Sequence, residues 1–297
     1  GVKMSKLAEN LSKLAYLGTS GGSHDTRRER ALKVSRFAAF LISQNVQIRT
    51  VDQIKTQYIE NYVKNQLDNG KSKRSLQNEM AALRAVLRAA GREKLVESER
   101  LSNKSLGLSG ANRAGTNRAM TQEEFQKAHT ALTAHGSHSE AAALSLMFTM
   151  GLRAKEAVRA SEGLKAWQRQ IASEGRITVI WGTKGGRSRD VLIFDRQTAL
   201  VAVQEAIKST DVKTDRLING VGGTLESARD RLDNQLRGVL KELNLSAHSA
   251  RYAFAQRQVD HYIEAGFSKR EALAQASCDL GHGSDRFRYI GQVYDQR

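Results

Sequence analysis

Residues 176–193 read RITVIWGTKGGRSRDVLI, and their period differs from that of the sequence on either side. Apolar residues alternate with polar or smaller ones before and after a glycine pair (Ile177, Val179, Trp181, Val191 and Ile193). This alternation with a period of two, interrupted by Gly185 and Gly186, predicts an antiparallel hairpin of two strands. The expected turn carries Lys184 and Arg187, so the tip of the hairpin is basic.

Helical patterns surround this hairpin. After it, four stretches have helical periodicity and are separated by Gly or Asn (199–207, 225–243, 250–265 and 269–278). Before it, Thr121 and Glu124 form a capping box that opens a helical segment extending to Gly151. We therefore expect this part of the chain to be mainly α with one small antiparallel hairpin, an α+β arrangement.

The N-terminal part of the chain has helical patterns only. Thr26 and Glu29 form another capping box, which predicts the start of a helix. Residues 75–90 carry an apolar stripe, with Arg84 and Arg88 lying off it. The first hundred residues therefore predict a small helical bundle.

The length of the chain, 297 residues, exceeds the usual size of one domain, so two domains are expected. Residues 102–117 are rich in Ser, Asn, Gly and Lys and have little apolar periodicity, which indicates an exposed linker. We place the helical N-terminal domain at residues 1–110 and the hairpin-containing domain at residues 118–297.

The chain is strongly basic, with 47 Lys and Arg against 31 Asp and Glu and a net charge of +16. Because the basic residues recur along the whole chain, a nucleic acid is the expected partner. The longest apolar run, 141–150, is too short to span a bilayer, and no membrane partner is expected. Cys278 is the only cysteine, which argues against a disulfide framework or a cysteine zinc cluster and favours a reducing cytoplasm.

The second domain also carries a set of polar residues suited to catalysis. In chain order they are an Arg-x-x-Glu pair, the hairpin lysine, a His-x-x-Arg pair, a glycine-flanked histidine and a C-terminal tyrosine (Arg153, Glu156, Lys184, His248, Arg251, His282 and Tyr294). Taken singly, each is an ordinary surface residue, such as an exposed ion pair or a solvated turn lysine. Only the ordered combination points to a site.

This combination resembles the catalytic domain of the tyrosine recombinase or phage integrase family. The signature of that family is an Arg, a hairpin Lys, a His-x-x-Arg pair, a His or Trp after Leu-Gly, and a Tyr. Residues 149–153, TMGLR, resemble its first box, and residues 280–283, LGHG, resemble its third. The resemblance covers residues 120–297, and the preceding helical domain is similar in character to the family's core-binding domain, which contacts DNA.

Two spacings depart from the family pattern. The stretch between Arg251 and His282 is longer, which predicts an extra turn or loop around Gly266. After His282, Tyr289 comes early and Tyr294 comes late. We choose Tyr294 as the nucleophile because residues 290–294, IGQVY, resemble the family's apolar-then-Tyr ending, and Tyr289 is the alternative.

The resemblance implies a role for each residue of the set. Arg153 and Arg251 clamp the non-bridging oxygens of the scissile phosphate, and Glu156 holds the Arg153 guanidinium toward it. His248 assists proton removal from the tyrosine, and His282 donates to the phosphate. Lys184 protonates the departing 5′ oxygen.

The implied product is a 3′-phosphotyrosyl link with a free 5′ hydroxyl, formed without a metal or nucleotide cofactor. The implied partners are double-stranded DNA target sites and a homo-tetramer assembled on two of them, for integration, excision or inversion of a DNA element. Arg84, Arg88 and Arg187 are the candidates for DNA contact. Two alternatives share the same composition: a non-catalytic architectural DNA-binding protein and a type IB topoisomerase.

Overall fold

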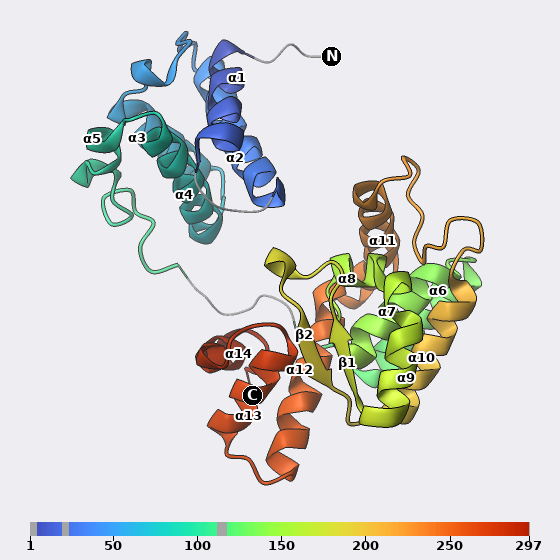
Figure 1. Ribbon diagram of the computed structural model, residues 1–297. Coiled ribbons are helices and arrows are strands. Elements are labelled where there is room, and N and C mark those ends of the chain that lie inside the picture. The colour runs from blue at the N-terminus through green and yellow to red at the C-terminus, as the bar shows by residue number, and fades with distance from the viewer. Residues whose placement is uncertain (1–4, 20–23, 112–117, 297) are drawn as a thin grey trace. The chain divides into compact units, whose positions relative to one another are not determined.

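The computed structural model describes residues 5–19, 24–111 and 118–296, and the chain divides into two compact units, Gly1–Arg113 and Ala114–Arg297 (Figure 1). Both units are built mainly from helices. The described residues contain one sheet, which has two antiparallel strands and belongs to the second unit. The expected fold class, mainly α with a small antiparallel hairpin, is confirmed.

The described part of the first unit contains five α-helices (α1 Lys6–Lys13, α2 His24–Ser43, α3 Thr56–Asp68, α4 Lys73–Ala89 and α5 Glu93–Val96). Their apolar faces meet in a core that includes Leu11 and Phe37. α4 begins slightly before residue 75 because the Ser72 side chain accepts a hydrogen bond from the Ser75 N–H at 3.2 Å. α2 already includes Thr26, so the capping box predicted there does not mark its start.

The predicted linker is partly folded against the first unit. Leu106 and Leu108 are buried in the core of that unit. Residues 102–111 are therefore an edge of the first unit, whereas residues 112–117 lie outside the described residues. Two leucines in a turn-rich segment supply this burial without the helical period that marks a packed segment in a sequence.

The second unit contains the remaining elements: α6 Gln122–Ala134, α7 His138–Met150, α8 Ala154–Val158, α9 Leu164–Glu174, β1 Arg176–Val179, β2 Arg189–Leu192, α10 Arg196–Ser209, α11 Leu225–Leu240, α12 Ala247–Glu264, α13 Lys269–Asp279 and α14 Phe287–Val293. α7 is buried on nearly all sides, which explains its continuous apolar run. It packs against α6, α10 and α12. Within the described ranges, no helix is both long and apolar enough to cross a membrane.

The two strands form the predicted hairpin. Their register pairs Ile177 with Val191 and Val179 with Arg189. Ile177, Val179 and Val191 are fully buried, as their alternation predicts. β1 packs beside α9 and β2 beside α13, so the hairpin joins the middle of the unit to its C-terminal helices (Figure 1).

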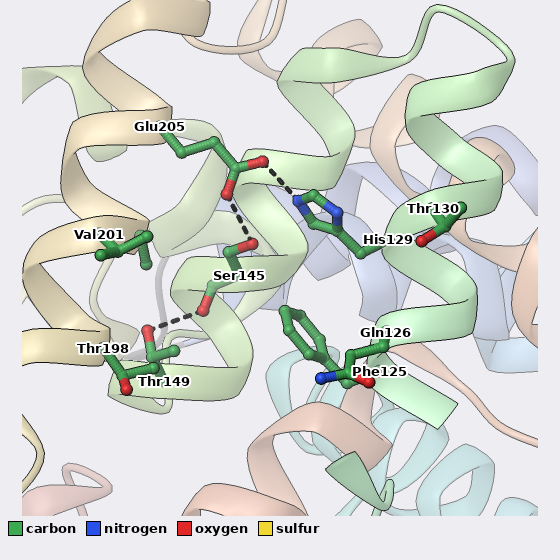
Figure 2. Close-up of a pocket in the computed structure, with 10 residues that line it drawn as sticks. Phe125, Gln126, His129, Thr130, Ser145, Thr149, Thr198, Val201 and Glu205 are labelled. Carbon is green, nitrogen blue, oxygen red and sulfur yellow. Dashed lines mark hydrogen bonds and ion pairs between the residues drawn. The ribbon is translucent and has the colours of Figure 1, made fainter. Parts of the chain in front are cut away.

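A partly buried chain of polar contacts ties α6, α7 and α10 together. The Glu205 carboxylate on α10 contacts His129 Nε2 at 2.5 Å and accepts a hydrogen bond from the Ser145 hydroxyl at 2.9 Å. Figure 2 shows these residues around a cavity of about 250 Å³, with Phe125 and Val201 among the apolar lining. The hydrogen bond and charge of Glu205 raise the pKa of His129 above its ordinary value.

This pair is expected to make the stability of the protein depend on pH. Since the folded-state pKa of His129 is raised, its contribution is complete below the unfolded pKa of about 6.5 and is lost as the pH rises through the folded pKa. His129→Gln should therefore lower the free energy of unfolding by about 1 kcal/mol more at pH 5.5 than at pH 9. Urea unfolding of both proteins at the two pH values measures this, and an equal loss at both would contradict it.

Candidate active site

Four segments of the second unit meet at one place: the end of α7, strand β2, the first turn of α12 and the turn after α13. The Arg251 guanidinium links three of them, because it donates to the Gly151 and Leu280 carbonyls. Gly151 ends α7 with a φ of +66°, and a Cβ there would lie 2.3 Å from the ring of Phe254. Only glycine combines this left-handed turn with such close packing.

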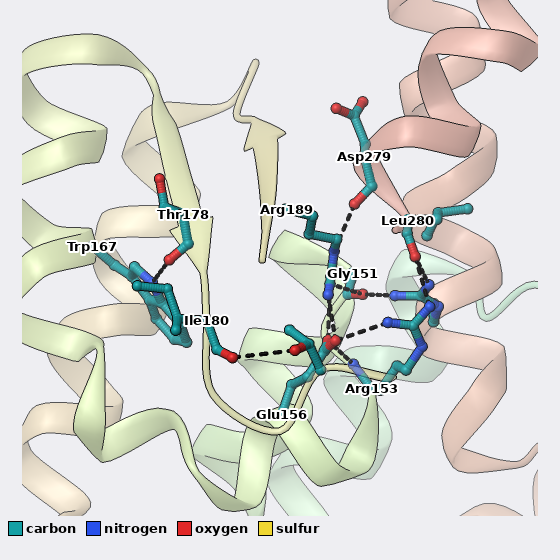
Figure 3. Close-up of polar contacts among 11 residues, drawn as sticks. Gly151, Arg153, Glu156, Trp167, Thr178, Ile180, Arg189, Asp279 and Leu280 are labelled. Carbon is teal, nitrogen blue, oxygen red and sulfur yellow. Dashed lines mark hydrogen bonds and ion pairs between the residues drawn. The ribbon is translucent and has the colours of Figure 1, made fainter. Parts of the chain in front are cut away.

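The Glu156 carboxylate is the centre of the polar contacts at this place. It is fully buried and accepts hydrogen bonds from the Arg153 backbone N–H at 2.8 Å and from Arg153 Nη1 at 2.9 Å. Both Nη atoms of Arg189 also donate to it (Figure 3). Burial by itself raises the pKa of Glu156, but the charge and hydrogen bonds of Arg189, with the charge of Arg251, hold that pKa below its ordinary value.

Arg153 and Arg251, predicted as the pair that clamps a phosphate, share one acceptor. Both donate to the Leu280 carbonyl, Arg153 at 2.9 Å. Arg251 is fully buried, which lowers its pKa to about 10, so it still carries its charge at pH 7. The Nε atom of Arg251 is buried and has no hydrogen-bond partner among the described residues. A buried cation with an unsatisfied donor is suited to an anionic ligand.

Both predicted histidines lie in the field of these arginines. Burial and the charges of Arg251 and Arg153 lower the pKa of His248, and burial with the same charges and that of Lys184 lowers the pKa of His282 to about 4. His282 is therefore neutral at pH 7. Its Nε2 atom is buried and, like Arg251 Nε, has no partner in the described structure.

The two C-terminal tyrosines differ in position and exposure. Tyr294 follows α14, is 7% exposed, and its ring centroid lies 6.0 Å from Arg251 Cζ and 6.2 Å from the His282 ring. Tyr289, within α14, is 37% exposed and lies 5.3 Å from the His282 ring. Burial raises the pKa of Tyr289. The more buried Tyr294 is the one whose ring also packs against Tyr252, at 4.5 Å.

The hairpin tip brings Lys184 to the edge of this cluster. Lys184 opens a short 3₁₀ turn, Lys184–Gly186, in which Gly185 has a φ of +73°. It is exposed, and Arg187 on the same tip is exposed as well. The effect of Lys184 on the pKa of His282 places its charge within electrostatic range of that ring. The structure thus gathers six of the predicted residues around the buried side chains of Glu156, Arg251 and Tyr294, with His248 exposed among them, and the exposed Lys184 lies at the hairpin tip.

Two domain families match the chain. Residues 107–257, slightly more than half of it, match the family described as "Integrase", and residues 4–96 match "Phage integrase, N-terminal". The chain belongs to the tyrosine recombinase family of integrases. His282, Tyr289 and Tyr294 lie beyond the matched residues, so their assignment depends on the geometry above.

Solved structures of integrases have the same fold. The Tn1549 transposon integrase, in complex with transposon right end DNA, is 13% identical over 96% of this chain and 94% of that chain, with a TM-score of 0.62. The lambda integrase bound to DNA is 14% identical over 95% of each chain, with a TM-score of 0.60. The XerH recombinase bound to its palindromic substrate is 18% identical over 89% of this chain and 75% of that chain, with a TM-score of 0.52. No curated protein matches the chain significantly.

In this integrase the candidate DNA contacts of the first unit are not equivalent. Arg84 donates to the Leu101 carbonyl at 2.7 Å and to the Asn103 side chain at 3.0 Å. It therefore holds the edge of its own unit. Arg88 has an exposed side chain and a loose ion pair with Glu93 at 3.8 Å. Of the two, Arg88 is the more accessible to a phosphate.

Sequence reasoning missed one residue of this integrase site, Arg189. It was absent from the predicted set, yet it is buried and bridges Glu156 to the backbone of the last residue of α13. A signal was available, because Arg189 precedes Val191 and Ile193 at the spacing of one strand face. A charge on the apolar face of a strand requires a buried partner.

Proposed function

We propose that this integrase is a site-specific recombinase that cuts DNA with Tyr294 and rejoins it through a 3′-phosphotyrosyl intermediate. The observation that carries the proposal is that the buried Arg251 and the partly buried His282 lie beside the ring of Tyr294, with Arg153 sharing the Leu280 carbonyl with Arg251. Two buried nitrogen atoms of this cluster, Arg251 Nε and His282 Nε2, have no partner among the described residues, and in the proposed tautomer of His282 both are donors. A phosphodiester has the charge and the acceptor oxygens that such donors require.

The reaction exchanges one phosphodiester for another. The Tyr294 hydroxyl oxygen attacks the phosphorus and loses its proton to His248, while the bond from phosphorus to the 5′ oxygen breaks. Lys184 gives a proton to the departing oxygen, so the products are a tyrosyl phosphodiester and a 5′ hydroxyl. Rejoining reverses these transfers with the 5′ hydroxyl of the exchanged strand as the attacking group.

The electrostatics of the site suit each of these roles. A phenol has a pKa near 10, so it needs a base, and the lowered pKa of His248 keeps that imidazole neutral and able to accept a proton at pH 7. Neutral His282 donates its N–H to a phosphate oxygen. The two guanidinium groups stabilise the charge that grows on the non-bridging oxygens in the transition state.

The proposed partners are double-stranded DNA sites and three further copies of this chain. The net charge of +16 favours a polyanion, and the solved relatives include DNA complexes and a lambda integrase tetramer on a Holliday junction. The proposed location is the bacterial cytoplasm or nucleoid, where a recombinase encoded by the cell, a phage or a mobile element would meet its DNA sites. Arg88 and Arg187 are the proposed DNA contacts, with Arg84 holding the edge of the first unit.

The proposal is tested by incubating the protein with a nicked DNA site that releases a short 5′-hydroxyl fragment after cleavage. Cleavage then cannot be reversed, and a protein–DNA adduct that survives denaturation should accumulate. The DNA in the adduct should have a blocked 3′ end, and the released fragment should have a free 5′ hydroxyl. Binding without any adduct would favour the architectural alternative, and supercoil relaxation without recombinant product would favour the topoisomerase.

Lys184→Met is expected to slow cleavage by about a hundredfold, because an alkoxide leaves slowly without a proton donor. The free energy of unfolding should stay unchanged, since the side chain is exposed. A substrate with sulfur in place of the bridging 5′ oxygen supplies the discriminating measurement, because a thiolate needs no proton to leave. The variant should cleave that substrate at nearly the wild-type rate. Equal slowing on both substrates would contradict the proposed role.

A further inference from the structure

We propose that Arg189 is a positioning residue for DNA cleavage, which keeps the Arg153 guanidinium available to the phosphate by saturating Glu156. The inference rests on the proposed function of this site. Arg189 lies on the buried face of β2, and its guanidinium meets the Glu156 carboxylate together with that of Arg153 (Figure 3). It would act through Glu156 and the backbone, without touching the reacting atoms.

Four hydrogen bonds occupy the acceptor positions of the Glu156 carboxylate. Oε1 accepts from Arg153 Nη1 and Arg189 Nη1, and Oε2 accepts from the Arg153 backbone N–H and Arg189 Nη2. A carboxylate has about four acceptor positions, so four donors leave none open. Arg153 therefore gives Glu156 a single side-chain hydrogen bond and retains other N–H groups for a ligand.

Removing Arg189 would change this balance. Glu156 would remain buried with two acceptor positions open, and the nearest cation able to fill them is Arg153. Arg–carboxylate pairs favour two parallel hydrogen bonds, and a buried charge is costly without partners. The Arg153 guanidinium would then rotate onto Glu156, away from the phosphate.

Arg189 also holds the backbone groups that orient both catalytic arginines. Its Nε donates to the Asp279 carbonyl at 2.9 Å, next to the Leu280 carbonyl that Arg153 and Arg251 share. A Cβ at Gly281 would lie 2.8 Å from Arg189 Cδ, so the turn that leads to His282 packs directly on this side chain. Arg189 thus links the hairpin to the turn that carries His282.

The test compares four variants in single-turnover cleavage of the nicked site at saturating DNA: Arg189→Met, Glu156→Gln, the double variant, and Arg176→Met. Arg176→Met is the matched control, because it removes an exposed arginine from the other strand of the hairpin. Arg189→Met should cleave about thirtyfold more slowly than wild type, with DNA affinity within about threefold. Arg176→Met should cleave at the wild-type rate.

The double variant gives the decisive comparison. Without the carboxylate charge, residue 156 no longer captures Arg153, so Glu156→Gln added to Arg189→Met should raise the cleavage rate at least about fivefold above that of Arg189→Met. A purely structural role predicts that the double variant is as slow as Arg189→Met or slower, and that result would overturn the proposal. Wild-type cleavage by Arg189→Met would overturn it too.

Two further measurements keep the test valid if Arg189→Met folds poorly. Arg189→Lys keeps the charge but has a single donor group, so it should fold, bind DNA, and cleave about tenfold more slowly than wild type. The double variant removes both buried charges and is expected to fold, as urea unfolding would show. Failure of the wild-type protein to form any adduct would reject the proposed function, whereas normal cleavage by the Arg189 variants would reject only this inference.

Discussion

Tyr294→Phe is expected to form no covalent adduct with the nicked DNA site, a loss of more than about 10⁴-fold in cleavage rate. The substitution removes only the attacking oxygen. The ring contacts with Tyr252 and His282 stay in place, so folding and DNA affinity should be unchanged. Adduct yield, measured by denaturing electrophoresis against a DNA-binding titration of the same preparation, checks both expectations.

Tyr289→Phe is the matched control for this prediction. Tyr289 lies within α14, next to the same histidine, but its side chain is more than a third exposed. We expect the Tyr289→Phe protein to form adduct at a rate within about threefold of wild type. The opposite pattern, with adduct lost in Tyr289→Phe and kept in Tyr294→Phe, would transfer the nucleophile to Tyr289.

The second large effect is expected at Arg251. Arg251→Ala should slow cleavage by about a thousandfold, because it removes one of the two guanidinium groups that stabilise the transition state. It should also lower the free energy of unfolding by about 2 kcal/mol, since the buried Gly151 carbonyl loses a donor.

Arg251→Lys separates charge from geometry at this position. Lysine keeps the positive charge, but its ammonium group lacks the planar set of N–H donors of a guanidinium. It therefore cannot donate to the Gly151 carbonyl, the Leu280 carbonyl and a phosphate at the same time in the geometry of Arg251. We expect a loss of about a hundredfold in single-turnover cleavage, with a smaller loss of stability than in Arg251→Ala. Cleavage by Arg251→Lys within threefold of wild type would show that the planar guanidinium is not required.

The parts of the fold that have a clear period were predicted well from sequence. The hairpin follows from its alternation, and α6 begins where Thr121 and Glu124 cap it, with both hydrogen bonds of the capping box present. The linker predicted over residues 102–117 has no such period, and within it Leu106 and Leu108 are buried in a turn-rich segment. Burial that depends on tertiary contacts leaves no local pattern.

The site residues that stand in a recognisable local sequence motif could be predicted from the sequence. His248 and Arg251 lie three residues apart at the start of one helix, and His282 follows a glycine after another. Arg189 is different, because its importance depends on Glu156 and the Asp279 carbonyl, which are distant in the chain. Such a long-range contact becomes visible only once the segments are folded together.

The stretch between Arg251 and His282 contains a turn between two helices. Residues between them complete α12, turn at Gly266 with a φ of +96°, and form α13, whose Ser268 caps its own first turn. The predicted turn around Gly266 is present. Because α13 ends at Asp279, the turn that follows brings the Leu280 carbonyl to Arg153 and Arg251.

The central claim is that a phenol near the C-terminus attacks a phosphate held by the buried arginines. Its most direct test is to digest the wild-type adduct with protease and nuclease and to identify the nucleotide-bearing peptide by mass spectrometry. We predict a single modified residue, Tyr294, linked to a 3′ phosphate. Modification at Tyr289, or at any residue other than a tyrosine of this segment, would contradict the account.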